Sequence, residues 1–227
     1  SSAASDVYKR QTPSCLIPAG DCLISLMRTI MNQENQTDWQ TSQCQVFLYP
    51  SCYDSVSTRL LTMGQIIGFV RSDAYEQFIR DLGAIIDEHG LKSEQYREQK
   101  QDMFCFSVYG SYHDIERRAY DRETDKISQI KIYNQIGHGD IDGLEIQQAI
   151  DLRARLSECL FIAWTFISPS QRGVKFGVRT NATLNNHIEH FQQIQEYFSR
   201  YLNLPIEKFD LKVKDLSRLC FLSHDPD

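Results

Sequence analysis

The order of strand-like and helix-like segments in the second half of the chain restricts its fold more than any other feature. From residue 103 onward, short apolar, aromatic or alternating runs predict strands, and two longer segments with apolar residues three and four positions apart predict helices. The strand-like runs are 103–112, 127–133, 160–167, 174–179 and 219–222, and the helical segments are 144–156 and 184–202. The order, roughly β, β, α, β, β, α, β, predicts an antiparallel or mixed sheet with helices on one face, an α+β fold.

Within these segments the sequence also predicts one turn, two core residues and the buried face of one helix. A turn is expected at Gly110 and Ser111, inside the first strand-like run. Trp164 and Phe166 lie within an apolar strand and are expected in the core. The buried face of the last helix is expected to consist of Ile188, Phe191, Ile194 and Phe198.

The first half of the chain is predicted to form an N-terminal α/β subdomain. The spacing of apolar residues predicts a helix over 21–32, and the run 45–49 predicts a strand. One further helix is expected to include Leu60, Leu61, Ile66 and Ile67. Another is expected to begin at a cap at Ser72 or Asp73 and to end at Gly90, followed by a loop or exposed helix over 92–102.

Three segments follow from this pattern. Residues 1–11 look like translated sequencing adapter and are left out of the fold prediction. Residues 12–102 are assigned to the helical and strand-containing N-terminal subdomain, and residues 103–227 to a core domain.

Composition limits the class of protein. The 227 residues are 41% hydrophobic and 24% charged, as in globular domains, and no apolar run reaches the roughly 18 residues of a membrane helix. We therefore expect a soluble, cytoplasmic protein without a membrane partner, and the N-terminus shows no signal-peptide pattern. The seven cysteines are odd in number and include no CxxC pair, which favours reduced, mostly buried thiols over disulfides or a zinc ribbon.

Asp140-Ile141-Asp142 is the first group that could carry chemistry. Residues two apart in a strand point to the same face, so both carboxylates would project into one site. Convergent carboxylates hold pairs of Mg²⁺ or Mn²⁺ ions about 3.5–4 Å apart, which is compatible with the net charge of −6. The same residues after Gly139 would also fit a polar turn without a catalytic role.

Residues 168–175 form the second group. One predicted strand enters this segment and another leaves it. Hydroxyl groups, a glycine backbone that can be approached closely and two cations suit a triphosphate, although a basic surface hairpin has the same composition. The side chains and backbone in question are those of Ser168, Ser170, Arg172, Gly173 and Lys175.

A third group lies near the end of the chain. Asp210 or Asp215 could supply a third carboxylate, and Arg218 could pair with a phosphate. A solvated loop before a core strand would have the same residues.

In this order, the three groups resemble the archaeo-eukaryotic primase superfamily, and within it the bacterial and phage primase-polymerases known as VirE N-terminal-like domains. A Ser-Gly-aromatic turn of that group is similar to 109–112, and a basic stretch follows it, as Arg117 and Arg118 do here. The segment 168–175 resembles the group's SPSGKGLK-like hairpin. Residues 215–227 (DLSRLCFLSHDPD) are similar to its closing DxSRLCFxSxDPD pattern.

The resemblance covers about residues 60–227 and implies a primase-like catalytic core with an RRM-like sheet and packed helices. It implies that Asp140, Asp142 and Asp210 are catalytic and bind two Mg²⁺ or Mn²⁺ ions, with Asp215 as the alternative to Asp210. It also implies a nucleotide-binding set, which consists of Ser168, Ser170, Arg172, Gly173, Lys175 and Arg218.

The activity implied is template-directed transfer of a nucleotide from a nucleoside triphosphate to a primer end or to a first nucleotide, with release of pyrophosphate. The implied partners are a single-stranded DNA template, the primer strand, nucleoside triphosphates and a helicase domain or subunit.

The sequence departs from the superfamily in two places. Many members have a His where Lys175 stands, and the strand entering the aspartates is usually continuous and apolar, whereas 136–139 is polar and predicted to be flexible. His138, between two glycines, is expected to be exposed. His187 and His190 are expected on the surface or in the core, because no cysteine or carboxylate spacing supports zinc there.

Two other functions compete with the polymerase. A primase-like domain without catalysis, which positions nucleic acid for a helicase or nuclease, would fit Lys175 and the polar segment before Asp140. A metal-dependent phosphodiesterase could use His138 with Asp140 and Asp142, but the chain has no His-x-His pair to support it.

Overall fold

The computed structural model describes residues 44–113 and 129–227. These residues form three antiparallel sheets and five α-helices, which confirms the α+β class. The helix predicted over 21–32 and the basic residues Arg117 and Arg118 lie outside the described residues. None of the described helices combines the length and apolar character that crossing a bilayer requires.

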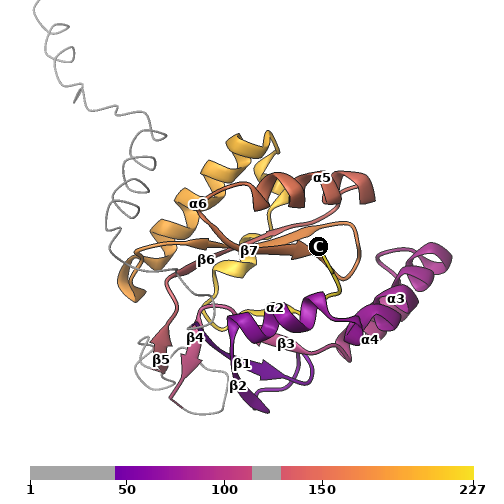
Figure 1. Ribbon diagram of the computed structural model, residues 1–227, viewed down its shortest axis with the longest axis horizontal. Coiled ribbons are helices and arrows are strands. Elements are labelled where there is room, and N and C mark those ends of the chain that lie inside the picture. The colour runs from indigo at the N-terminus through magenta and orange to yellow at the C-terminus, as the bar shows by residue number, and fades with distance from the viewer. Residues whose placement is uncertain (1–43, 114–128) are drawn as a thin grey trace, which may run out of the picture.

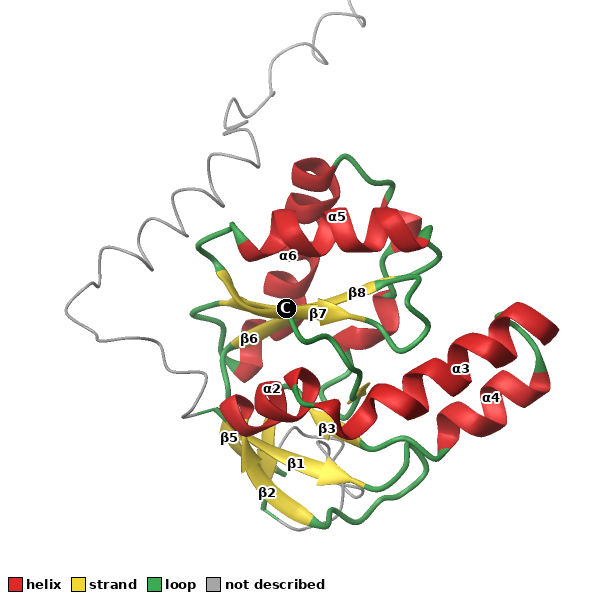
Figure 2. Ribbon diagram, turned by 45° about the vertical axis from the view of Figure 1, so that its right-hand side comes forward, coloured by secondary structure: helices red, strands yellow, loops and turns green. Residues whose placement is uncertain are grey.

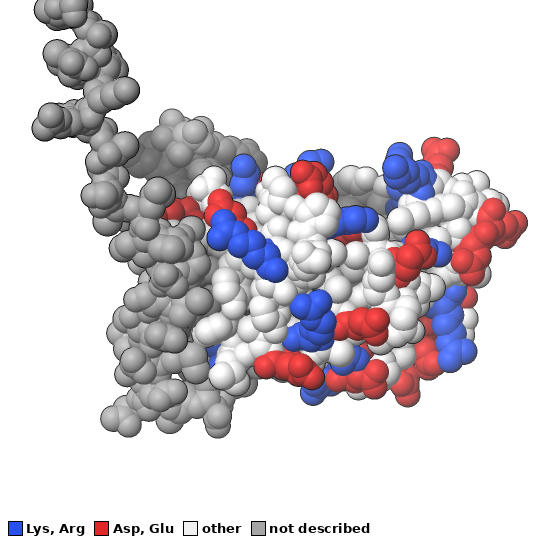
Figure 3. Space-filling view, turned by 90° about the horizontal axis from the view of Figure 1, so that it is seen from above, with Lys and Arg blue, Asp and Glu red and all other residues white. Residues whose placement is uncertain are grey.

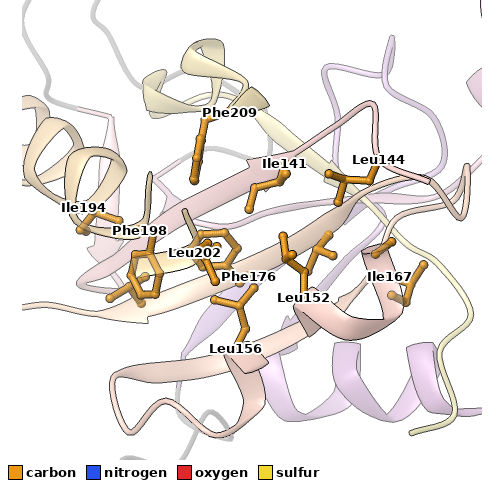
Figure 4. Packing of buried hydrophobic residues seen from close by; sticks show 13 residues of the cluster. Ile141, Leu144, Leu152, Leu156, Ile167, Phe176, Ile194, Phe198, Leu202 and Phe209 are labelled. Atoms are coloured by element: carbon orange, nitrogen blue, oxygen red, sulfur yellow. The ribbon is translucent and has the colours of Figure 1, made fainter. Parts of the chain in front are cut away.

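A three-stranded sheet lies at the centre of the molecule. Its strand order is β6–β8–β7, with β6 at Ile136–Ile141, β7 at Ile162–Ile167 and β8 at Val174–Arg179. Helices α5 (Ile146–Ser157) and α6 (His187–Leu202) cover one face of this sheet (Figure 1). Figure 4 shows the apolar side chains that join the helices to that face, which we call the helical face.

A four-stranded sheet packs toward the other face of the three-stranded sheet (Figure 2). Its order is β2–β1–β3–β9, and the strands are β1 (Gln45–Tyr49), β2 (Arg59–Thr62), β3 (Cys105–Ser107) and β9 (Leu219–Phe221). This sheet takes two strands from before the predicted boundary at residue 102 and two from after it. Trp164 and Phe166 are buried between the two sheets together with helix α2 (Met63–Arg71), as predicted for core residues.

The remaining elements extend from the four-stranded sheet. Helices α3 (Glu76–His89) and α4 (Glu94–Gln101) form a hairpin, in which Ser93 caps α4 by accepting a hydrogen bond from the Tyr96 backbone N–H. Strands β4 (Gly110–Tyr112) and β5 (Ile130–Tyr133) form a separate two-stranded ribbon. No disulfide joins the cysteines of the described residues, and Cys44, Cys105 and Cys220 are buried.

The helix predicted around Leu60 and Leu61 is wrong at its start. Both residues belong to strand β2, where Leu60 pairs with Phe47 and Leu61 with Val46. Helix α2 begins only at Met63, because Thr62 forms a capping box with Gln65. Pairing with β1 therefore determines the conformation of two residues whose apolar spacing also suits a helix.

The predicted Gly110-Ser111 turn is also wrong, since both residues lie in strand β4. Gly110 has a φ of 149°, and a Cβ atom there would lie 1.8 Å from the Ile132 carbonyl oxygen of β5. Glycine is needed at this position because the two strands approach so closely.

The last helix is confirmed, and three of the four residues predicted for its buried face are buried, but the first residue of that face is His187 and not Ile188. Ile188 is 45% exposed, whereas His187 is buried. The helix begins at His187 after a 3₁₀ turn, and the stripe that starts there continues through Phe191, Ile194 and Phe198 to Leu202.

The segment before the aspartates was predicted to be polar and flexible, and this prediction is wrong. All six residues of β6 are buried, and the strand pairs along its whole length with β8. Gly137 and Gly139 leave room for apolar side chains of the helical face: a Cβ atom would lie 2.2 Å from Ile194 Cδ1 at the first position and 2.1 Å from Phe176 Cζ at the second. The glycines therefore allow close packing.

Candidate functional site

A pocket of about 470 Å³ opens between the two sheets, and we call it the inter-sheet pocket. It receives residues from strands β6, β8 and β9, from helix α4 and from the loops at 52–53, 168–170 and 210–218. Its charged and hydroxyl-bearing residues are Tyr53, Lys100, Asp140, Asp142, Ser168, Ser170, Lys175, Asp210, Asp215, Ser217 and Arg218.

Asp140 and Lys175 form an ion pair at the floor of this pocket. They are directly opposite each other on β6 and β8, are only 7% and 5% exposed, and the Lys175 ammonium donates to Asp140 Oδ2. Burial is the largest single influence and disfavours both charges, but the partner's charge, their hydrogen bond and other nearby charges together outweigh it, so the pKa of Asp140 is lowered and that of Lys175 is raised. Asp140 Oδ1 is buried and has no hydrogen-bond partner within the described residues.

Asp142 follows the end of β6 and reaches the same pocket from a more exposed position. Its backbone N–H donates to the Lys208 carbonyl oxygen at 3.0 Å. The surrounding protein removes part of the hydration of its carboxylate, and this desolvation, followed by the charge of Asp140, raises the pKa of Asp142. The two aspartates therefore share one pocket in different environments.

Asp210 is brought beside β6 by the backbone. Its N–H donates to the Asp140 carbonyl oxygen at 2.8 Å, and Phe209 forms a β-bridge with Ile141. The Arg218 guanidinium lies 3.6 Å from Asp210 Oδ2.

Asp215 also lines the pocket, and one carboxylate oxygen of each candidate is engaged in a turn: Asp210 Oδ1 accepts a hydrogen bond from the Lys212 N–H at 2.9 Å. Asp215 Oδ1 accepts hydrogen bonds from the Ser217 N–H at 2.9 Å and from the Ser217 hydroxyl at 2.8 Å. Of the two candidates for a third carboxylate, Asp210 is the one hydrogen-bonded to the strand that carries Asp140.

The residues of segment 168–175, which connects β7 and β8, divide into two groups. Ser168 and Ser170 line the pocket, with their hydroxyl oxygens 3.0 Å apart. Gly173 supports them, because a Cβ atom there would lie 2.4 Å from the Ile141 carbonyl oxygen and 3.0 Å from Asp142 Oδ1. Arg172 does not line the pocket, and its guanidinium lies 3.4 Å from Glu145.

A second hollow, which we call the outer groove, adjoins the inter-sheet pocket. It has a volume of about 660 Å³ and shares Asp142, Asp210 and Arg218 with that pocket. Lys208 and Lys212 also line it. Elsewhere, on the face seen in Figure 3, acidic and basic side chains are interspersed over the described residues.

His138 is not exposed, so that prediction is wrong. The side chain is fully buried between the sheets, both ring nitrogens lack a hydrogen-bond partner within the described residues, and burial lowers its pKa to about 3. A buried, neutral imidazole cannot reach a substrate, which disfavours the phosphodiesterase hypothesis. His187 is a core residue, as predicted, and its ring nitrogens contact the Tyr133 hydroxyl and the Lys214 carbonyl oxygen.

The carboxylates fit a divalent cation in chemistry but not as a compact set. Oxygen ligands suit Mg²⁺ and Mn²⁺, and Asp140 Oδ1 is free of hydrogen bonds within the described residues. Within residues 44–113 and 129–227, however, no three His, Cys, Asp or Glu residues are arranged to hold an ion. The Lys175 ammonium is the present partner of Asp140.

The chain matches one known protein family over the part that contains most of this pocket. A family model described as "BT4734-like, N-terminal domain" matches residues 99–227, more than half of the chain. The chain belongs to the BT4734-like N-terminal domain family. The match includes the central sheet, both helices that cover it and every carboxylate of the pocket. No curated protein and no solved structure matches the chain.

Several pocket residues were not predicted from the sequence. Cys52 and Tyr53 precede the segment matched by the BT4734-like family, and Lys100 is its second residue. Lys100 lies on α4 among other charged and polar residues, so no local pattern distinguishes it. Ser217 could have been identified only through the motif that contains Asp215 and Arg218.

Proposed function

We propose that this protein is a primase-polymerase: a template-directed nucleotidyltransferase whose three-stranded sheet and two covering helices form a catalytic core of the archaeo-eukaryotic primase kind. One observation carries the proposal. Carboxylates from two distant segments, Asp140 with Asp142 and Asp210, line one pocket together with the hydroxyls of Ser168 and Ser170.

In this proposal, Asp140, Asp142 and Asp210 would hold two Mg²⁺ or Mn²⁺ ions. When bound, such ions activate the attacking hydroxyl group and neutralise charge on the transferred phosphate. The side chains of the pocket align the primer 3′-hydroxyl oxygen with the α-phosphorus of the nucleoside triphosphate. A bond forms between these atoms, and the bond to pyrophosphate breaks.

The nucleotide would be bound by Ser168 and Ser170, by the backbone at Gly173 and by Lys175 and Arg218. Hydroxyl and backbone N–H donors suit phosphate oxygens, and the cations add charge. Arg172 is left out of this set because it faces Glu145. A single-stranded DNA template, a primer strand and a helicase domain or subunit are the proposed partners.

The first test is incorporation of labelled nucleotides on single-stranded DNA with Mg²⁺ or Mn²⁺, with and without a primer. Asp142→Asn should lower incorporation at least about 100-fold, since loss of groups that merely support a metal ligand already costs about 10–100-fold. Asp151→Asn is the matched control, because Asp151 is exposed on α5 and hydrogen-bonded to Gln147. Equal activity of Asp142→Asn and wild type would refute the proposal.

A second function is favoured by the Asp140–Lys175 pair. Because Lys175 already neutralises Asp140, the same domain could bind single-stranded nucleic acid without catalysis. Template binding with no incorporation under either metal, and no affinity for Mn²⁺, would support this alternative.

A further inference from the structure

Lys100 differs from the other cations of the inter-sheet pocket. Lys175 is paired with Asp140, and Arg218 lies 3.6 Å from Asp210. Within the described residues, no carboxylate lies within ion-pair distance of the Lys100 ammonium, and no hydrogen bond from that ammonium is found. Lys100 therefore brings into the pocket a positive charge that Asp142 and Asp140 attract only from a distance and that no carboxylate of the described residues contacts directly.

The position of Lys100 is fixed by aromatic rings. Its ammonium lies 4.7 Å from the centre of the Phe221 ring and 5.6 Å from the centre of the Tyr96 ring, which gives it cation–π contacts. Tyr96 is buried between α4 and α3, in an apolar cluster with Ile79 and Leu82. Lys100 lies in the last turn of α4 and lines the pocket. Figure 2 shows the α3–α4 hairpin that carries it.

The environment of Lys100 is unfavourable for a charge in the absence of a ligand. Burial, followed by the nearby charge of Lys175, lowers the pKa of Lys100. An anion beside the Lys100 ammonium would relieve both effects. The anion must also be polar enough to use the hydroxyls of Ser168 and Ser170, which a phosphate group satisfies.

We infer that Lys100 binds the phosphate groups of the incoming nucleoside triphosphate, from the side of the pocket formed by helix α4. This inference rests on the proposed function, because the same pocket holds the proposed metal ligands. It makes the α3–α4 hairpin part of the nucleotide site, although most of the hairpin precedes the segment matched by the family.

The test compares the affinities of one nucleoside and its triphosphate by isothermal titration calorimetry in the presence of Mg²⁺. Lys100→Met should weaken triphosphate binding about 10–100-fold, the usual effect of losing a charge-assisted hydrogen bond. Binding of the nucleoside should not change. Lys100→Arg should restore part of the triphosphate affinity, and Lys92→Met, which alters an exposed lysine in the loop before α4, should leave it unchanged.

Each failure has its own signature. If wild type binds the triphosphate and Lys100→Met binds it equally well, the inference is overturned and the proposed function stands. If Lys100→Met loses affinity for the nucleoside and the triphosphate to the same extent, the residue acts through the fold and the inference is also overturned. If wild type does not bind the triphosphate, the proposed function fails together with the inference.

Discussion

The two faces of the three-stranded sheet differ in what they bury. The helical face is mainly apolar, with Ile141, Val174 and Phe176 packed against α5 and α6, although Thr165, opposite Phe176, brings one buried hydroxyl to it. The opposite face buries the Asp140–Lys175 pair, His138 and Trp164, and polar atoms of His138, Asp140 and Trp164 lack partners within the described residues. Burying polar atoms without partners costs free energy, so these groups of the second face, which we call the pocket face, oppose folding, whereas Trp164 and Phe166 on the same face favour it by packing in the apolar core.

The difference assigns separate roles to residues that alternate along one strand. In β6, Ile141 contributes to the apolar core, while Asp140 lines the pocket. A strand can carry both because neighbouring side chains point to opposite faces. The helical face therefore stabilises a geometry that the pocket face could not maintain by itself.

The largest effect should follow from breaking the ion pair on the pocket face. Lys175→Met keeps the length of the side chain but leaves the Asp140 carboxylate buried without an opposite charge. Removing one partner of a buried pair costs about 3–5 kcal/mol, so the free energy of unfolding should fall by that amount. Urea denaturation of the metal-free protein would measure the loss.

A double variant shows whether the buried charge causes that loss. Asp140→Asn combined with Lys175→Met removes both charges, and most of the lost stability should return. If Lys175→Met alone costs less than about 1 kcal/mol, as for an exposed pair, the pocket face is not desolvated as the structure indicates.

A smaller effect is expected from adding one methyl group to either face. Gly139→Ala would place Cβ 2.1 Å from Phe176 Cζ on the helical face, and Gly177→Ala would place it 2.3 Å from Trp164 Nε1 on the pocket face. Overpacking of this kind costs about 1–3 kcal/mol, so both variants should be destabilised by similar amounts.

Fluorescence distinguishes the two glycine variants. Trp164 is one of two tryptophans in the chain and contacts Gly177 but lies on the other face from the Gly139 position. Gly177→Ala should shift the tryptophan emission, whereas Gly139→Ala should leave it close to that of wild type. The same shift of tryptophan emission in both variants would mean that overpacking one face of the sheet also changes the packing of the other.

Several features that depend on local pattern were predicted correctly from the sequence, although the turn at Gly110 and the start of the helix at Leu60 were not. Apolar spacing predicted the helix that became α6, and Gly90 ends α3 as predicted, because helix faces and caps are encoded within a few residues. Of the predicted caps Ser72 and Asp73, Ser72 caps the 3₁₀ turn Asp73–Tyr75, and α3 begins only after it, at Glu76. The position of Asp140 and Asp142 in one pocket also agrees with the two-residue period of a strand.

Features that depend on distant residues could not be predicted. The sequence Gly137-His138-Gly139 has no apolar pattern, and it is a buried strand because Ile194 and Phe176 fill the space over its glycines. The pairing of Lys175 with Asp140 follows from the register of β6 and β8. Lys100 reaches the pocket through the packing of α4, about 40 residues before the aspartates, and no local signal marks it.

The smallest effect is expected at Asp142, an exposed carboxylate of the pocket. Replacing it should raise the free energy of unfolding, whereas the variants above should lower it. Burial and the charge of Asp140 raise the pKa of Asp142 in the folded protein, so the folded state binds its proton more tightly than the unfolded state does. The contribution of Asp142 to stability therefore falls as the pH rises through the window between its unfolded and folded pKa values. Asp142→Asn has no charge to lose, and at neutral pH in metal-free buffer it should be more stable than wild type.

Because solvent screens this exposed carboxylate, the gain from Asp142→Asn should be less than about 1 kcal/mol. Denaturation curves recorded from neutral to acidic pH should show the two proteins converging as Asp142 becomes protonated in both states, while Asp151→Asn shows no such convergence. A variant that is inactive yet more stable would show that the pocket face retains Asp142 at a cost to folding. If the difference in unfolding free energy between Asp142→Asn and wild type is the same at every pH, the effect comes from packing. The charge of Asp142 would then not contribute to the difference between the two faces.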